Sequence, residues 1–313
     1  VFVCEQKIIE DQEFDDKDKV SYHIMLKEND KIGIVACSNA LPIQAKSSIH
    51  ELEKILKRHQ LEPVFSQYIY QTKDLYSGTG QQKAMALMDF YMDQDIKAIF
   101  DISGGDMANE VLSYLDFDII KENPKPFFGY SDLTTIINAI YTKTNQSAYL
   151  YQLKNLIKEN KVNQQKDFFS SMLEGTNNLM DIPWTFTFHQ GSEINGIVVG
   201  GNIRCFLKLA GTPYFPNLQD KVLFLESFGG EAPQMITYFH QLKQMGAFDK
   251  ISGLLLGTFT KFEENNHSDI VKLIQPIIHN PNLPIAKTNL VGHHSDSKCL
   301  IIGENIQIKC KIS

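Results

Sequence analysis

The sequence predicts an α/β fold of two domains, an N-terminal domain built on a parallel sheet and a smaller C-terminal domain with a mixed, barrel-like sheet. The first observation behind this prediction is size, because the chain has 313 residues, 43% of them hydrophobic, enough for two ordinary domains with substantial cores. The second is that short apolar runs alternate with amphipathic stretches from Lys31 onward, as in βαβ units. The third is that the apolar runs lie closer together toward the C-terminus, which favours antiparallel or barrel-like pairing.

The N-terminal block opens with an acidic extension, residues 1–27, and the first domain is predicted over 28–143. Its first strand is "KIGIVAC" at 31–37, and its first helix, 47–59, carries four apolar residues on one face: Ile49, Leu52, Ile55 and Leu56. The pattern continues with strands at 64–70, 96–103 and 126–130, and with helices at 81–94, at 107–115 and directly after Ser131. Strands joined by helices of about 10 to 15 residues predict a parallel, Rossmann-like sheet, with ligands beyond the carboxyl ends of its strands.

A polar stretch rich in Asn and Gln, residues 144–183, is interpreted as a linker with one helical piece. The second domain is then predicted over 184–313. Its strands are expected near 196–201, 221–227, 251–259, 285–289, 299–303 and 306–311, and its helices near 203–211, 233–245 and 268–278.

Composition excludes several classes of partner. The net charge is −7 and no long Lys/Arg run occurs, so neither a nucleic-acid polymer nor a membrane is expected as a partner. No apolar stretch approaches the roughly 18 residues that span a bilayer. The N-terminus is acidic where a signal peptide would be basic and then apolar, which indicates a cytoplasmic protein with reduced cysteines. No C-x-x-C, H-E-x-x-H or complete EF-hand loop is present, so no metal and no cofactor is expected.

The stretch "KPFFGYSDLTTIINAIYTK", 125–143, places Ser131 between an apolar run and an amphipathic helix. Two interpretations are open. On a sharp strand-to-helix turn Ser131 is a nucleophile, exposed beside the free N–H groups of the first helical turn. As the residue before a helix it is an N-cap, and the full G-x-S-x-G elbow pattern is missing.

A serine nucleophile needs a base, and the base needs an orienting carboxylate. His293 lies in the Gly-flanked loop "NLVGHHSD" between two predicted strands, where catalytic residues gather. Glu226 in "KVLFLESFGG" is a lone acid at the end of an apolar run. Burying its charge there would be costly unless the carboxylate has a partner, which a catalytic histidine would supply. The competing interpretation of Glu226 is an edge-strand residue that faces solvent.

The stretch "SGGDMANEVLSYLDFDIIKENPKPFFGYSDLTTIINAIY", 103–141, closely resembles the serine-peptidase family that contains the LD-carboxypeptidases and the microcin C self-immunity peptidases. The segments "LKENDKIGIVACSNAL", "GGNIRCFLKLAGTPYFP", "KVLFLE" and the "GH" of 292–293 resemble the family's other blocks in the same order. The resemblance covers the chain from about residue 26 to its end. It implies an interdomain site, an acyl-enzyme mechanism and a homodimer.

Carried over by position, the resemblance makes Ser131 the nucleophile, Glu226 the orienting acid and His293 the general base. It implies an oxyanion site formed by the backbone N–H groups of Gly105 and Asp132. His294 is the alternative base, but it lacks the preceding glycine of the "GH" pair.

The family offers two substrate classes, murein tetrapeptides in cell-wall recycling and peptidyl or aminoacyl nucleotides of the microcin C type. Trp184 resembles a tryptophan of the immunity branch that stacks on the nucleobase, and this favours the second class; the competing interpretation is that Trp184 packs at a domain interface. Two departures from the family pattern are Cys37, where a proline is usual, and the absence of a Gly-Pro pair after the nucleophile helix. A two-domain small-molecule binding protein is the alternative that is not an enzyme.

Overall fold

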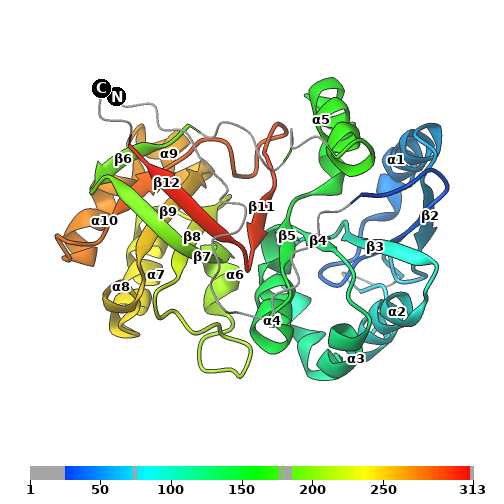
Figure 1. The fold of residues 1–313 in the computed structure, drawn as a ribbon, viewed down its shortest axis with the longest axis horizontal. Helices are drawn as coiled ribbons and strands as arrows, with labels where there is room; N and C mark the ends of the chain where they lie inside the picture. Colours follow the sequence, from blue (N-terminus) through cyan, green and yellow to red (C-terminus); the bar gives the residue numbers. More distant parts are fainter. Residues whose placement is uncertain (1–24, 73–75, 176–178, 180–184, 311–313) are drawn as a thin grey trace.

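The computed structural model describes residues 25–72, 76–175, 179 and 185–310. These residues form two six-stranded sheets that lie side by side, each with its own helices (Figure 1). No helix among them is long and apolar enough to cross a membrane. The predicted α/β fold with two sheet domains is confirmed.

The first sheet has the strand order β11-β5-β4-β3-β1-β2. Five of its strands run parallel, as the βαβ pattern predicts: β1 (Lys31–Val35), β2 (Glu62–Phe65), β3 (Ile96–Asp101), β4 (Phe127–Gly129) and β5 (Ala148–Leu150). The sixth, β11 (Leu300–Ile302), comes from near the C-terminus and pairs antiparallel with β5. The chain therefore returns to its first sheet before its last strand completes the second.

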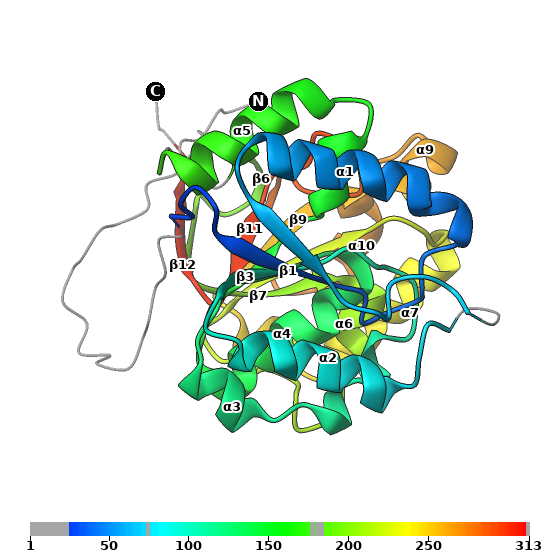
Figure 2. The same ribbon diagram turned by 90° about the vertical axis from the view of Figure 1, so that its right-hand side faces the viewer.

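Helices cover both faces of the first sheet (Figure 2). On one face lie α1 (Lys46–Arg58) and α5 (Lys161–Leu173), and on the other lie α2 (Gly80–Met92), α3 (Phe117–Glu122) and α4 (Thr134–Thr144). The predicted face of α1 is buried against the sheet. A capping box between Thr79 and Gln82 begins α2, which satisfies two of the N–H groups that a helix start leaves free.

Three predicted segments differ in the structure. The strand expected at 64–70 lies earlier, as β2, and ends at Phe65. The helix expected at 107–115 is instead two 3-10 turns, η2 (Ala108–Glu110) and η3 (Leu112–Tyr114). The segment 144–183, expected to be a linker, contributes β5, the turn η5 (Leu153–Ile157) and α5 to the first half of the molecule. The polar sequence of α5 concealed a buried side that includes Phe168 and Met172, and this side packs in the core of the first sheet.

The second sheet has the order β12-β7-β8-β9-β10-β6 and is mixed. Its parallel centre is β7 (Glu193–Asn202), β8 (Val222–Ser227), β9 (Gly253–Phe259) and β10 (Ile285–Lys287), and its antiparallel edges are β6 (Thr187–Gln190) and β12 (Asn305–Lys309). The helices of this half are α6 (Ile203–Leu207), α7 (Ala232–Gln244), α8 (Ala247–Lys250), α9 (Thr260–Asn266) and α10 (Ile270–Ile278). Buried side chains of α7 and α10 share one apolar cluster with β8 and β9.

The two halves meet where α4 packs against α6 and β7. Asn138 on α4 joins them directly, because its Nδ2 donates to the Gly200 carbonyl (2.8 Å) and its Oδ1 accepts from the Gly200 N–H (2.9 Å). The carboxyl ends of β4 and β8 therefore lie close together, and the candidate site is at this junction.

Candidate active site

Ser131 occupies a sharp corner between β4 and the helical turn η4 (Ser131–Leu133) that leads into α4. Its φ is +60°, in the left-handed region that costs an L-residue other than glycine roughly 1–2 kcal/mol. The chain before the corner is tight, because a Cβ on Gly129 would lie 2.6 Å from the Cβ of Leu133. No side chain caps the start of η4 or α4, so the Ser131 hydroxyl is not the helix cap that its sequence position allows.

The Ser131 hydroxyl faces His293, with 3.1 Å between Oγ and Nε2. The other ring nitrogen of His293, Nδ1, lies 2.7 Å from Oε2 of Glu226. Glu226 is on β8, Ser131 follows β4 and His293 lies in the loop after β10, so three distant segments meet. The chain of contacts Ser131–His293–Glu226 is the arrangement that a nucleophile, a base and an orienting acid require.

Glu226 is completely buried, which rules out the solvent-facing interpretation of this residue. Its second oxygen, Oε1, accepts a hydrogen bond from Nδ2 of Asn202 at 3.1 Å. Both carboxylate oxygens are therefore occupied, and the orientation of the group is set by two donors. A buried carboxylate is costly unless it is partnered in this way.

Aromatic rings hold the imidazole of His293 from two sides. The Tyr130 ring meets it edge-on with 5.0 Å between centroids, and the Phe228 ring lies 5.2 Å away. Tyr130 is buried, and burial together with the nearby Glu226 carboxylate raises the pKa of its phenol well above the ordinary value. Tyr130 thus stays neutral beside the histidine and limits its rotation.

His294, the alternative base, does not reach Ser131. Its Nδ1 bonds instead to Oδ1 of Asp296 at 2.6 Å, and its buried Nε2 has no hydrogen-bond partner within the described part of the chain. The geometry places His293, the histidine preceded by Gly292, next to the serine.

Asp132 and Gly105 flank the corner. The Asp132 side chain is fully buried, and it accepts from the Ser38 hydroxyl (2.6 Å) and the Ala108 N–H (2.7 Å) while pairing with Lys208 Nζ (2.5 Å). Because Lys208 follows α6, this ion pair ties the serine corner to the second half of the molecule. The side-chain contacts of Asp132 therefore fix the position of its own backbone N–H, which lies in the first helical turn.

Gly105 has φ +127°, and a Cβ there would collide with the Asn39 side chain, so glycine is required. Its neighbour Gly104 lines the cavity beside Ser131. The "SGG" stretch therefore reaches the site, with Gly104 rather than Gly105 on the cavity wall. Trp184 lies outside the described residues.

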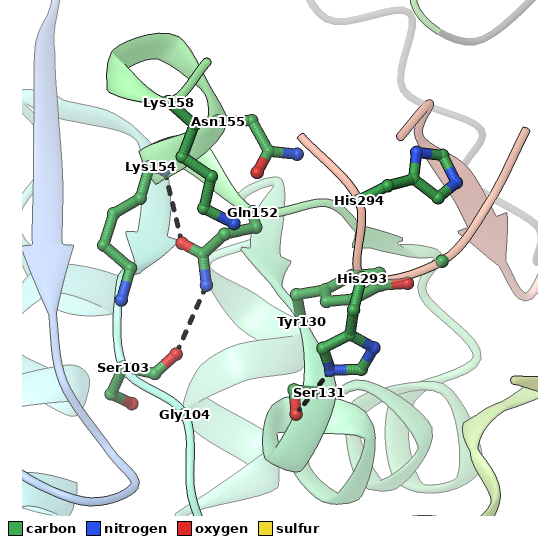
Figure 3. A pocket seen from close by; sticks show the side chains of 11 residues that line it. Ser103, Gly104, Tyr130, Ser131, Gln152, Lys154, Asn155, Lys158, His293 and His294 are labelled. Carbon is green, nitrogen blue, oxygen red and sulfur yellow. Dashed lines mark hydrogen bonds between the residues drawn. The ribbon is translucent and has the colours of Figure 1, made fainter. Parts of the chain in front are cut away.

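A cavity of about 170 Å³ opens beside the serine (Figure 3). Its wall is formed by eleven residues: Ser103, Gly104, Tyr130, Ser131, Gln152, Lys154, Asn155, Lys158, Gly292, His293 and His294. Four of these, Gln152, Lys154, Asn155 and Lys158, were not identified from the sequence, because their segment was interpreted as a linker. The short apolar run that forms β5 is the signal that could have found them, since ligands bind beyond the carboxyl ends of parallel strands.

Metal binding and thiol chemistry are two further activities that the residues around the site could support. Among the described residues, no group of three or more His, Cys, Asp or Glu side chains is placed to hold a metal. The Cys37 thiol is buried, and burial raises its pKa well above the ordinary value. A neutral buried thiol is a poor nucleophile, so Cys37 packs near the site without serving it.

Comparisons with known proteins agree on one family. A family model for the LD-carboxypeptidase N-terminal domain matches residues 32–152, and one for the LD-carboxypeptidase C-terminal domain matches residues 195–308. The chain is 25% identical to the putative carboxypeptidase YocD of Bacillus subtilis, with 92% of this chain and 96% of the relative covered. It is 25% identical to the microcin C7 self-immunity protein MccF of Escherichia coli (76% and 78% covered) and 22% identical to a probable murein peptide carboxypeptidase of Bacillus subtilis (89% and 88%).

The fold agrees with these matches. A structure of MccF in complex with glutamyl sulfamoyl guanosine superposes with a TM-score of 0.80 at 21% identity, covering 91% of this chain and 97% of that one.

Proposed function

This chain belongs to the LD-carboxypeptidase family, and from that premise we propose that it is a serine peptidase in which Ser131 is the nucleophile, His293 the general base and Glu226 the orienting acid. The observation that carries the proposal is the pair of contacts made by the two nitrogens of His293, 3.1 Å to the serine hydroxyl and 2.7 Å to the buried carboxylate. Packing alone does not require a serine, a histidine and a glutamate from three separate segments to form one chain of hydrogen bonds.

In the first step His293 Nε2 takes the proton of the Ser131 hydroxyl while Oγ forms a bond to the carbonyl carbon of a substrate amide. The imidazole becomes a cation, and the Glu226 carboxylate stabilises it through Nδ1. Asn202 holds the other carboxylate oxygen, so Glu226 meets the cation without having to turn.

The carbonyl oxygen becomes an oxyanion in this step, and we assign its donors to the backbone N–H groups of Asp132 and Gly105. The buried contacts of the Asp132 side chain fix the direction of the first helical turn before substrate arrives. The tetrahedral intermediate then collapses, His293 returns its proton to the leaving amine, and an acyl-enzyme remains. Water, activated by the same histidine, hydrolyses the ester and restores the serine.

For the substrate we propose a small peptide or a peptidyl or aminoacyl nucleotide, as in microcin C immunity. The relative named as a microcin C7 self-immunity protein supports this class. Trp184 is the proposed stacking residue for the nucleobase. We expect the enzyme to work in the cytoplasm, as a homodimer, without metal or cofactor.

The second candidate is a murein tetrapeptide LD-carboxypeptidase in cell-wall recycling. It is favoured by the relative named as a probable murein peptide carboxypeptidase, which matches over most of this chain. A binding protein without activity would have no use for the ordered contacts of His293.

The test is labelling with a fluorophosphonate, which reacts only with an activated serine. We expect labelling of the wild type at Ser131, none in Ser131→Ala, and unchanged labelling in the control Ser170→Ala, a serine on α5 outside the cavity. Absence of labelling in the wild type would refute the serine mechanism.

Turnover of an aminoacyl sulfamoyl adenosine and of a murein tetrapeptide, each followed by mass spectrometry, separates the two substrate classes. If Trp184 stacks on the base, Trp184→Ala should lower cleavage of the nucleotide analogue roughly 5- to 150-fold and leave the tetrapeptide unaffected.

A further inference from the structure

One wall of the cavity carries positive charge opposite the serine. This wall, called here the η5 wall, consists of Gln152, Lys154, Asn155 and Lys158, all in or next to the turn η5. In Figure 3 its lysine side chains descend from η5 on one side of the cavity, while Ser131 and His293 lie on the other. None of the eleven residues that line the cavity is acidic.

The ammonium groups of the η5 wall lack anionic partners. Within the described ranges, neither Nζ of Lys154 nor Nζ of Lys158 makes a hydrogen bond or an ion pair with another residue. Three lysines elsewhere in the protein with little exposure are paired with acids: Lys83 with Glu110, Lys208 with Asp132 and Lys287 with Glu263. A fourth, the partly buried Lys125, donates its ammonium group to three backbone carbonyls. Lys154, which is partly buried, therefore differs from these four lysines in having no partner for its ammonium group, whereas Lys158 is exposed.

The negative charge of Asp101 raises the pKa of Lys154, but the Asp101 carboxylate is hydrogen-bonded to other groups. Its Oδ2 accepts from the Cys37 N–H (2.7 Å), and its Oδ1 accepts from the Ser103 N–H (2.8 Å) and hydroxyl (2.5 Å). Three donors therefore occupy the two carboxylate oxygens of Asp101, and it forms no ion pair with Lys154.

The positive charge of Lys154 is costly because the residue is partly buried. Burial lowers the pKa of Lys154 to about 8, and the nearby positive charge of Lys158 acts in the same direction. An anion beside the Lys154 ammonium group would offset both effects, because an opposite charge at short range favours the charged form of the lysine.

The wall is held in place before any ligand binds. The Gln152 side chain donates from Nε2 to the Ser103 carbonyl (3.3 Å) and accepts at Oε1 from the Lys154 N–H (3.3 Å). Asn155 is 2% exposed, and its Oδ1 has no hydrogen-bond partner in the described chain. Figure 3 shows the Asn155 amide beside Lys158, so this oxygen can accept an N–H of a ligand that brings its anion to the lysines.

We propose that the η5 wall is the specificity subsite of the enzyme and that Lys154, assisted by Lys158, holds a carboxylate of the substrate while the scissile carbonyl lies on Ser131. The inference rests on the proposed function, since it takes Ser131 as the reacting group. The carboxylate has two possible sources: the free C-terminus of the leaving residue of a peptide, or the acidic side chain of the acyl residue of an aminoacyl nucleotide.

Two pairs of substrates test the proposal, each differing only in one charge. The first pair is a D-alanine-terminated murein tetrapeptide and its C-terminal amide. The second pair is aspartyl sulfamoyl adenosine and asparaginyl sulfamoyl adenosine. In the wild type we expect kcat/KM to favour the charged member of at least one pair by roughly ten- to a hundredfold, the range for a hydrogen bond to a charged group. The pair that shows the preference identifies the source of the carboxylate.

In Lys154→Gln the preference should fall to within about threefold, whereas Lys154→Arg should keep most of it because the charge is retained. The matched control is Lys272→Gln, an exposed lysine on α10, which should behave as the wild type. Fluorophosphonate labelling of Ser131 should be unchanged in Lys272→Gln and should persist in both Lys154 variants, because the probe carries no carboxylate. Should Lys154→Gln fail to fold, Lys154→Arg and Lys158→Gln carry the test.

Equal turnover of both members of both pairs, or a preference that survives in the Lys154→Gln/Lys158→Gln double variant, would overturn the inference and leave the serine mechanism standing. So would labelling of Ser131 without turnover of any of the four compounds. Failure of the wild type to be labelled at all would overturn both the inference and the proposed function.

Discussion

Replacing Glu226 by Gln should almost abolish catalysis while leaving the fold intact. The carboxylate accepts two hydrogen bonds, from His293 Nδ1 at 2.7 Å and from Asn202 Nδ2 at 3.1 Å. A glutamine of the same shape has one acceptor oxygen and one donor nitrogen, so it can serve only one of these partners as before. Because Asn202 offers an N–H2 donor, the glutamine oxygen should turn to it and present its own N–H2 to His293.

The histidine must then accept at Nδ1 and carry its proton on Nε2, the atom that faces Ser131 at 3.1 Å. In this tautomer Nε2 cannot take the serine proton, and the carboxylate that stabilised the imidazolium is gone. A matched substitution of this kind lowers kcat by about 10⁴, equivalent to about 5.5 kcal/mol of transition-state stabilisation. The free energy of unfolding should change by no more than about 2 kcal/mol, because the lost charged hydrogen bond is offset by relief from burying a carboxylate.

The assay is the second-order rate of fluorophosphonate labelling at Ser131, which requires no knowledge of the natural substrate, with unfolding in urea followed in parallel. Glu264→Gln, at an exposed glutamate that pairs with Lys261 on the surface, is the control and should label at the wild-type rate. Labelling of Glu226→Gln within tenfold of the wild type, with the fold intact, would refute the role of Glu226 and the tautomer argument with it.

Three further predictions follow from the same contacts. Ser131→Gly should be more stable than Ser131→Ala by up to about 1 kcal/mol in urea unfolding, because φ is +60° and glycine adopts this conformation without strain; equal stability would contradict a strained corner. Lys208→Met should destabilise the protein by about 3 kcal/mol and slow labelling, because it leaves the buried Asp132 carboxylate without its cation, and Lys208→Arg should recover most of the loss; a neutral Lys208→Met would argue against an ion pair that supports the site. The kcat/KM of a carboxylate-bearing substrate should fall as the pH rises through about 8, because Lys154 loses its charge there in the free enzyme. Lys158 and Asp101 are the other charged groups that act on the pKa of Lys154. The decline should be missing in Lys154→Gln.

Much of the fold follows from local sequence patterns. The alternation of apolar runs and amphipathic helices from Lys31 to the nucleophile helix predicts β1, β3, β4, α1, α2 and α4, because each of these elements buries one face that repeats at its own period. The family blocks around Ser131, Glu226 and His293 lie at the ends of strands, and the structure brings these three residues together. Local signals place each residue after a strand, but β4 belongs to the first sheet and β8 and β10 to the second, so the packing of α4 against α6 and β7 is what brings the three together.

Long-range pairing is what the sequence does not reveal. β11 is a three-residue strand near the C-terminus that joins the first sheet beside β5, and nothing in "LII" specifies a partner about 150 residues earlier. The same holds for the segment interpreted as a linker, whose polar composition conceals β5 and a helix packed through Phe168. A short strand such as β11 pairs with whichever sheet edge is still free after the other elements have packed, and the local sequence does not specify that edge.

What the sequence determined by itself is the α/β class, the family, and the three residues whose types and strand-end positions fit serine chemistry. What only the tertiary structure decided is which histidine meets Ser131, the left-handed conformation that exposes it, the ion pair of Asp132 with Lys208, and the η5 wall with its unpaired lysines. The physical reason is that residue types and periodicities are local properties, whereas hydrogen bonds, burial and the pKa of Lys154 depend on which distant groups share the same small volume.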